Sequence, residues 1–220
     1  MQGEVTALKQ QKRRRDRANV YLDGEYAFSL QKVLAARLHV GQILAAEEVQ
    51  AFQAEDATEL AYERSLRYLS YRARSTEEVR RYLARKEVAP EAAELVIERL
   101  ERAGLLDDAA FAEQWVENRE TFRPRSRFAL KIELQQKGIP SRLAERATEG
   151  LDEGASARRA ADRKAQQLAR YDEGTFRKRL LGFLARRGFG YAIARRVVDD
   201  LWERYGSEET ELDRTGLEEI

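Results

Sequence analysis

The stretch RSRFALKIELQQKGIP, from Arg125 to Pro140, decides the fold of this chain. It predicts one short helix with a defined start and a defined end. Ser126 can cap the start, because a serine oxygen accepts a backbone N–H that the first turn leaves unbonded. Phe128, Leu130 and Leu134 give this helix an apolar side. Gly138 supplies the left-handed residue with which helices commonly end.

The same stretch occurs three times in the chain. RSTEEVRRYLARKEVAP begins at Arg74, 51 residues earlier, and TFRKRLLGFLARRGFG begins at Thr175, 50 residues later. The exit glycine recurs as Gly188, but the first copy has Glu87 there and must leave its helix without glycine's freedom. Repeats of this length with helical spacing predict tandem three-helix units. Each unit has a thin core, so we expect the units to stack into an elongated, curved array.

The repeats set the expected domain organisation. In the first repeat we expect a helix over 58–73, a second helix that begins with the capping box of Ser75 and Glu78, and a third that begins at Pro90 and ends at Gly104. Asp107 or Asp108 should cap the second repeat, and Gly206 should close the third. The predicted boundaries are 57–103, 104–152 and 153–206 for the repeats and 207–220 for an acidic C-terminal tail.

Residues 1–56 differ from the repeats. ANVYLDGEYAFSL alternates about Asp23-Gly24, which is typical of a two-residue β-hairpin. In this register Tyr21 faces Tyr26 and Val20 faces Ala27. EVTALK adds a third strand, and residues 31–55 read as short helices. We therefore predict a mainly α chain with a small N-terminal segment that contains the β-hairpin.

Composition and motifs argue against an enzyme. The 220 residues include no cysteine and a single histidine, His39, which excludes disulfides and thiolate metal sites and makes a Ser-His triad improbable. Phosphate-binding glycine motifs are absent. Asp107-Asp108 could hold a magnesium ion, although capping is the favoured interpretation; Trp115 and Trp202 could stack on bases, although core packing is favoured. We expect no cofactor and no metal.

We also expect no contact with a membrane and a cytoplasmic location. No apolar run approaches the ~18 residues of a membrane span, and no signal-peptide pattern is visible at the N-terminus. The chain is 43% hydrophobic and 36% charged, a balance that suits slender helical modules with much of each helix in water.

Charge is distributed unevenly along the chain. The net charge is only +1, but residues 153–206 carry thirteen Lys and Arg against seven acids, and residues 207–220 carry one Arg against six acids. This pattern indicates contact with a polyanion, although a solvated helix face would also explain it. The candidate partner- or DNA-binding residues are Arg13, Arg14, Arg15, Arg119, Arg123, Arg125, Arg127, Lys131, Arg177, Arg179, Arg186, Arg187, Arg195 and Arg196.

The repeats resemble the RecX family of bacterial recombinase regulators. The resemblance is carried by GLLDDAAFAEQWVENR followed by RPRSRFALKIELQQKGIP in the second repeat, and more loosely by YERSLRYLSYRARSTEEVRRYL in the first. It covers residues 57–206. It implies a monomer that binds the RecA recombinase and its nucleoprotein filament and inhibits ATP hydrolysis, strand exchange and the coprotease activity of the SOS response.

Two other functions remain open from the sequence. The basic third repeat could be a stand-alone DNA-binding module, with single- or double-stranded DNA bound weakly. The first two repeats are nearly neutral, however, and would meet phosphates with little charge. The chain could also be a helical adaptor for another protein.

Overall fold

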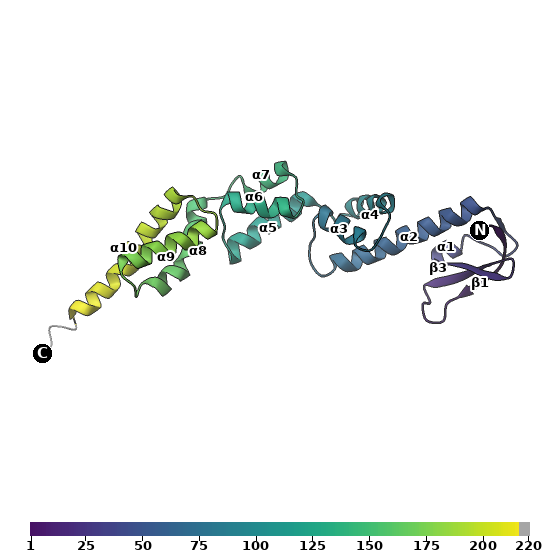
Figure 1. Cartoon of the computed structure of the whole chain (residues 1–220), viewed down its shortest axis with the longest axis horizontal. Helices are drawn as coiled ribbons and strands as arrows, with labels where there is room; N and C mark the ends of the chain where they lie inside the picture. Colours follow the sequence, from purple (N-terminus) through teal and green to yellow (C-terminus); the bar gives the residue numbers. More distant parts are fainter. Residues whose placement is uncertain (216–220) are drawn as a thin grey trace. The chain divides into compact units, whose positions relative to one another are not determined.

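The computed structural model describes the backbone of residues 1–215 and the side chains of residues 1–206 (Figure 1). It divides into two compact units, of which the first spans Met1–Leu106 and the second begins at Asp107. The first unit holds the N-terminal sheet and the first repeat. The second unit holds the second and third repeats. Ten helices and four strands are present in the described residues, and the predicted mainly α fold is confirmed.

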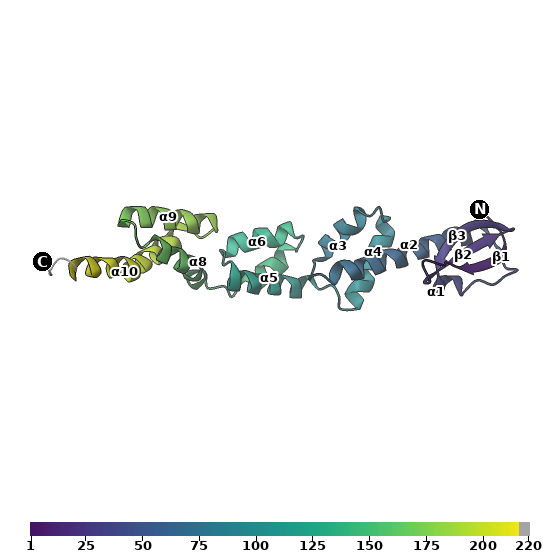
Figure 2. The ribbon, with the colours of Figure 1, turned by 90° about the horizontal axis from the view of Figure 1, so that it is seen from below.

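The N-terminal segment forms an antiparallel sheet in the order β3-β2-β1-β4, and the short helix α1 lies against β2 and β3 (Figure 2). The predicted hairpin and the third strand are confirmed, as is the pairing of Tyr21 with Tyr26. The predicted pairing of Val20 with Ala27 is wrong. A bulge between Val20 and Tyr21 shifts the register, so Val20 pairs with Phe28. The elements are β1 (Gly3–Gln10), β2 (Arg17–Leu22), β3 (Glu25–Gln31), α1 (Lys32–Ala35) and β4 (Ile43–Leu44).

Helix α2 (Ala46–Leu69) joins the sheet to the first repeat. The prediction of short helices over 31–55 is wrong for this part, because one helix runs through the boundary drawn at 56/57. The chain has no glycine or proline between Ala45 and Leu69, so no residue there stops a helix. Buried Asp56 fixes α2 to the sheet: its carboxylate accepts hydrogen bonds from the Arg17 guanidinium and the Gln31 backbone N–H, both at 2.6 Å.

The first repeat consists of the C-terminal half of α2 with two further helices, and its local signals are confirmed. Ser75 and Glu78 form the capping box, and Pro90 is the first residue of its helix. Glu87 adopts a φ of +57°, the left-handed conformation that glycine takes at the same place in the other repeats. The two helices are α3 (Thr76–Ala84) and α4 (Pro90–Arg102).

The second and third repeats each have three helices of their own. Asp107 and Ser126 cap their helices as predicted, each with its side-chain oxygen accepting backbone N–H groups. Gly206 does not end the last helix; it is buried inside it, and a Cβ there would lie 2.6 Å from the Trp202 ring. The helices are α5 (Asp108–Phe122), α6 (Arg127–Gln136), α7 (Ser141–Thr148), α8 (Glu153–Leu168), α9 (Glu173–Arg186) and α10 (Tyr191–Thr215).

Each module has its own apolar core. One cluster lies in the sheet, and one lies in each repeat. Trp202 packs against Phe176 in the third core, as predicted, whereas Trp115 lies at the edge of the second core and also makes polar contacts. The second helices of the three repeats align in sequence as expected, and two aligned apolar positions are fully buried in every copy. The first position carries Val79, Leu130 and Leu180, and the second carries Leu83, Leu134 and Leu184.

Repeats two and three are joined where the end of α9 meets the start of α6. The Ser126 backbone N–H donates to the Arg187 carbonyl at 3.1 Å. Gly188 has a φ of +87°, and a Cβ on it would lie 2.6 Å from the Ser126 oxygen and 2.9 Å from the Ala129 Cβ. Glycine is therefore required at residue 188 for two reasons, the left-handed backbone and the close approach of α6.

Candidate partner-binding surface

The second helix of each repeat presents an outer face that differs from copy to copy. Facing outward are Glu77 in repeat one, Phe128 in repeat two and Lys178 in repeat three, which occupy the same position of the repeat. Three further positions of the second helix also differ between the copies. In the order of the repeats they carry Glu78, Ala129 and Arg179; Arg81, Ile132 and Gly182; and Arg85, Gln136 and Arg186. Burial fixes the inner face of these helices, so the outer face is where the three copies can acquire different binding properties.

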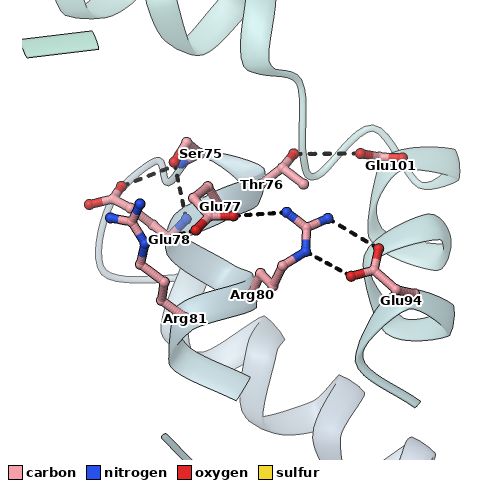
Figure 3. Close-up of polar contacts among 8 residues, drawn as sticks. All are labelled: Ser75, Thr76, Glu77, Glu78, Arg80, Arg81, Glu94 and Glu101. Carbon is pink, nitrogen blue, oxygen red and sulfur yellow. Dashed lines mark hydrogen bonds and ion pairs between the residues drawn. The ribbon is translucent and has the colours of Figure 1, made fainter. Parts of the chain in front are cut away.

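In repeat one Glu77 and Arg81 on this face are paired within the repeat (Figure 3). The Arg80 guanidinium lies between two carboxylates, 2.9 Å from Glu77 and 2.7 Å from Glu94, and Arg81 donates to Glu77 at 2.8 Å. Hydrogen bonds from Arg80 lower the pKa of both glutamates, and the same hydrogen bonds, the one to Glu94 first, raise the pKa of Arg80. This network ties α3 to α4 through Arg80 and Glu94.

In repeat two, several predicted binding residues have structural partners instead. Arg119 and Arg125 both contact Glu133, at 2.7 Å and 3.0 Å. Trp115 donates its indole N–H to the same carboxylate at 2.9 Å, and the charged groups of Arg119 and Lys137 lie over its ring. Glu133 therefore links α5 to α6, and Arg119 contributes to packing as well as to charge.

Arg127 and Arg187 lie at the junction of repeats two and three. Arg127 donates to the Leu151 carbonyl at 2.9 Å, and its backbone N–H donates to the Glu153 carboxylate at 2.9 Å. Arg187 donates to the Pro124 carbonyl at 3.0 Å and packs on the Phe183 ring. Burial lowers the pKa of Arg187, with a smaller contribution from the nearby positive charges of Arg125 and Arg123. The Arg187 side chain joins repeat three to repeat two, and the Arg127 side chain holds α6 to the segment that leads into repeat three.

Three more predicted residues are ion-paired on the surface. Lys131 lies 3.9 Å from Glu145, Arg177 pairs with Glu173 and Asp199, and Arg195 lies 3.8 Å from Asp199. Within residues 1–206, no carboxylate pairs with the remaining four predicted residues of these two repeats: Arg123, Arg179, Arg186 and Arg196.

A basic groove of about 540 Å³ lies between α8 and α9. The cations that line it are Lys164, Lys178, Arg179 and Arg186, and no acidic residue lines it. Gly182 lies on the same face, and a Cβ there would meet only the end of the flexible Arg186 side chain, at 3.4 Å.

Tyr171 lies at one side of this groove, where the electrostatic potential is positive. Hydrogen bonds from Arg170 and then from Arg179 lower the pKa of its phenol. Sequence reasoning missed Lys164, because nothing in the spacing of α8 shows which of its faces turns towards α9.

The basic residues Arg13, Arg14 and Arg15 lie in the predicted loop between two strands, β1 and β2. All three are exposed. Arg14 lies 3.6 Å from Asp16, and the Arg15 carbonyl accepts a hydrogen bond from Gln10. The loop is therefore accessible to a polyanion, in a different unit from the basic groove.

In residues 1–206 no three His, Cys, Asp or Glu side chains come together as metal ligands would, and Asp107 is engaged as a helix cap. Of the helices described, none combines the length and the apolar character needed to span a bilayer.

Comparison with known proteins gives a consistent result along the chain. Four family models match in order: the regulatory protein RecX N-terminal domain at 3–45, and the first, second and third RecX three-helix domains at 61–100, 107–147 and 152–198. The regulatory protein RecX of Amycolatopsis mediterranei is 41% identical over 66% of this chain and 85% of its own length. That of Bacillus pumilus is 30% identical over 97% of this chain and 82% of its own length.

Solved structures support the same fold. A crystal structure titled regulatory protein RecX matches 90% of this chain and all of that chain, with a TM-score of 0.71 and 24% identity. The crystal structure of RecX from Lactobacillus salivarius matches 67% of this chain and 97% of that chain, with a TM-score of 0.59 and 23% identity.

Proposed function

Because this chain belongs to the RecX family of regulatory proteins, we propose that it binds the RecA recombinase and its nucleoprotein filament and inhibits their activities. The activities are ATP hydrolysis, strand exchange and the coprotease reaction of the SOS response. The observation that carries the proposal is the unbroken order of four RecX domains along one chain. In this proposal the protein is a monomeric cytoplasmic regulator, not an enzyme, and it needs no cofactor and no membrane.

The structure supports a surface-based mechanism in which inhibition comes from binding. Three repeats on one chain can contact successive subunits of a filament, and linked contacts gain from a high effective concentration. A protein that holds neighbouring subunits in fixed positions opposes the movements that their catalytic cycle requires. In the second unit we assign the contact first to the arginines that the fold leaves without a carboxylate partner, which are Arg123, Arg179, Arg186 and Arg196.

An ATPase assay tests the proposal directly. The purified chain is added to recombinase that has been assembled on single-stranded DNA, and ATP turnover is followed. We expect turnover to slow at less than one protein per recombinase subunit, because one bound chain should affect more than one subunit. Unchanged turnover at equimolar protein would refute the proposal.

A second candidate function, nucleic-acid binding without the recombinase, is favoured by the basic groove. Four cations without a lining carboxylate are suited to phosphate oxygens, and the absence of a side chain at Gly182 allows a strand to approach α9 closely. Fluorescence anisotropy of a labelled oligonucleotide in the absence of recombinase distinguishes the two functions. Binding that depends on recombinase would count against this candidate.

A further inference from the structure

An apolar groove of about 710 Å³ lies in the first unit, between α2 and the turn that joins α3 to α4. Leu60 on α2, Val88 in the turn and Ala92 on α4 form apolar lining. Leu95 completes it and is 56% exposed. A leucine that is more than half exposed beside an apolar hollow is a surface that a partner can cover.

Carboxylates lie along the rim of this groove. Those of Glu55 and Glu59, on the α2 side, are already paired with arginines, at 2.6 Å from Arg37 and 2.6 Å from Arg99. Glu87 and Glu91, on the α4 side, have no ion pair within residues 1–206. Two cations, Arg64 and Lys86, also line the groove, so its four carboxylates outnumber its cations and the α4 side presents two carboxylates without an ion pair within residues 1–206.

Glu87 is held in a conformation that its residue type disfavours. Its φ is +57°, and the equivalent residues are glycines, Gly138 at +82° and Gly188 at +87°. An L-residue in this region carries a cost of roughly 1–2 kcal/mol. No hydrogen bond or ion pair of the Glu87 side chain within the described chain offsets this cost. Backbone hydrogen bonds hold the turn in this conformation instead: the Glu87 N–H donates to the Ala84 carbonyl at 3.0 Å and the Val88 N–H donates to the Leu83 carbonyl at 3.2 Å. The exposed carboxylate of Glu87 is therefore presented from a fixed turn.

We propose that this groove binds an apolar helical segment of the partner protein, and that a Lys or Arg of that segment pairs with Glu87. The proposal rests on the proposed function, since the partner is the recombinase that the chain regulates. Two helices with an apolar trough between them are the usual receptor for an amphipathic helix. The unpaired carboxylates require a positive charge beside the apolar face of the bound helix.

Other occupants fit this groove poorly. The phosphates of a nucleic acid would meet an apolar floor and a lining in which four carboxylates outnumber the two cations, Arg64 and Lys86. The C-terminal segment 207–220 of a second copy carries six acids and one Arg, so it would bring like charge to the same rim. A basic, apolar segment of another protein is the remaining match.

Substitution of Glu87 separates strain from binding. Glu87→Gly removes both the strain and the carboxylate, so we expect a higher melting temperature together with binding to the recombinase that is weaker by about fivefold or more. Glu87→Gln keeps the strain and removes only the charge, so binding should weaken without a higher melting temperature. For most loss-of-binding variants, by contrast, stability and binding fall together.

Leu95→Gln tests the apolar floor, and Leu66→Gln is the matched control, because Leu66 is a partly exposed leucine on α2 outside the groove. We expect Leu95→Gln to weaken binding at least fivefold and Leu66→Gln to leave it unchanged. Binding is measured as anisotropy of the labelled chain titrated with recombinase. If the wild-type chain does not bind, the proposed function fails; if it binds and the Glu87 and Leu95 variants bind equally well, the groove proposal is overturned. A lower melting temperature for Glu87→Gly would also overturn it.

Discussion

Arg127→Ala should lower the stability of the second unit, although a lone arginine on a helix surface would be expected to be dispensable. Its guanidinium donates at 2.9 Å to the Leu151 carbonyl, next to the start of the third repeat. A hydrogen bond from a charged donor contributes about 1.5–3 kcal/mol, and a buried group left without its partner adds to the loss. The wild-type Arg127 Nε is itself buried without a partner, which offsets part of this contribution. We therefore expect a net loss of about 1–2 kcal/mol.

Arg123→Ala is the matched control for this substitution. Arg123 is exposed, has no carboxylate partner within residues 1–206 and comes from the same short segment before α6. Its truncation should change stability by no more than about 0.5 kcal/mol. Loss of 1–2 kcal/mol in a unit of roughly 100 residues corresponds to a fall in melting temperature of about 4–16 °C, so the two variants are readily distinguished.

Differential scanning calorimetry of the full chain measures the effect, and the ATPase assay is run on the same preparations. We expect Arg127→Ala to lower the melting transition of the second unit, and Arg123→Ala to weaken inhibition with an unchanged melt. A melt of Arg127→Ala that matches wild type would refute the assignment of this arginine to the junction. Equal destabilisation by Arg123→Ala would refute the distinction between the two residues.

Three further predictions use the same logic of matched pairs. The double variant Lys178→Ala/Arg186→Ala should make the plot of log binding constant against log salt concentration less steep by about 1.4 for single-stranded oligonucleotides. Arg85→Ala, at the repeat-one position equivalent to Arg186, should leave this slope unchanged in anisotropy titrations. Gly188→Ala should destabilise the second unit by about 2–3 kcal/mol in urea unfolding, against about 1 kcal/mol for Gly104→Ala in the first unit. Both residues have a positive φ, but a Cβ at residue 188 would approach Ser126 and Ala129 closely, whereas one at residue 104 would meet no atom within 4 Å. Arg80 lowers the pKa of Glu77 and Glu94 in the folded state. The two ionised carboxylates therefore stabilise the fold above the ordinary pKa of 4.5, and this stabilisation is lost as the pH falls below that value. Thermal melts from about pH 5 to pH 3 should show the loss of stability, and Arg80→Met should make it smaller.

Local signals were sufficient to predict most helix starts and turns. Ser75, Ser126 and Asp107 cap the helices that follow them, because a side-chain oxygen beside an unbonded N–H acts within a few residues. The left-handed exit of the second helix was predicted where glycine occurs, at Gly138 and Gly188, whereas Glu87 left the turn of repeat one open; the structure shows that Glu87 adopts the same conformation. Such features depend on neighbours in sequence, so sequence alone contains them.

Features that depend on distant contacts could not be predicted in this way. The attachment of α2 to the sheet depends on the pairing of Asp56 with Arg17, two residues 39 positions apart. Gly206 was interpreted as a helix end because glycine usually ends helices, but here the Trp202 ring covers it. The candidate arginines also could not be sorted by sequence. Arg119 and Arg123 look alike there, yet only Arg119 has a carboxylate partner.

The repeats themselves explain why the shared motif is a poor guide to binding residues. Buried residues recur in all three copies because each core must be filled, and the motif that identifies the family consists largely of those residues and of caps and turns. At one outer position the copies instead carry Glu77, Phe128 and Lys178, and at the exit turn repeat one keeps a strained Glu87 where the others have glycine. Packing does not require these differences, so they are free to serve contact with a partner. It follows that variants at exposed outer positions, such as Phe128 and Lys178, should alter binding with little effect on the fold, and variants at the shared buried positions should alter the fold first.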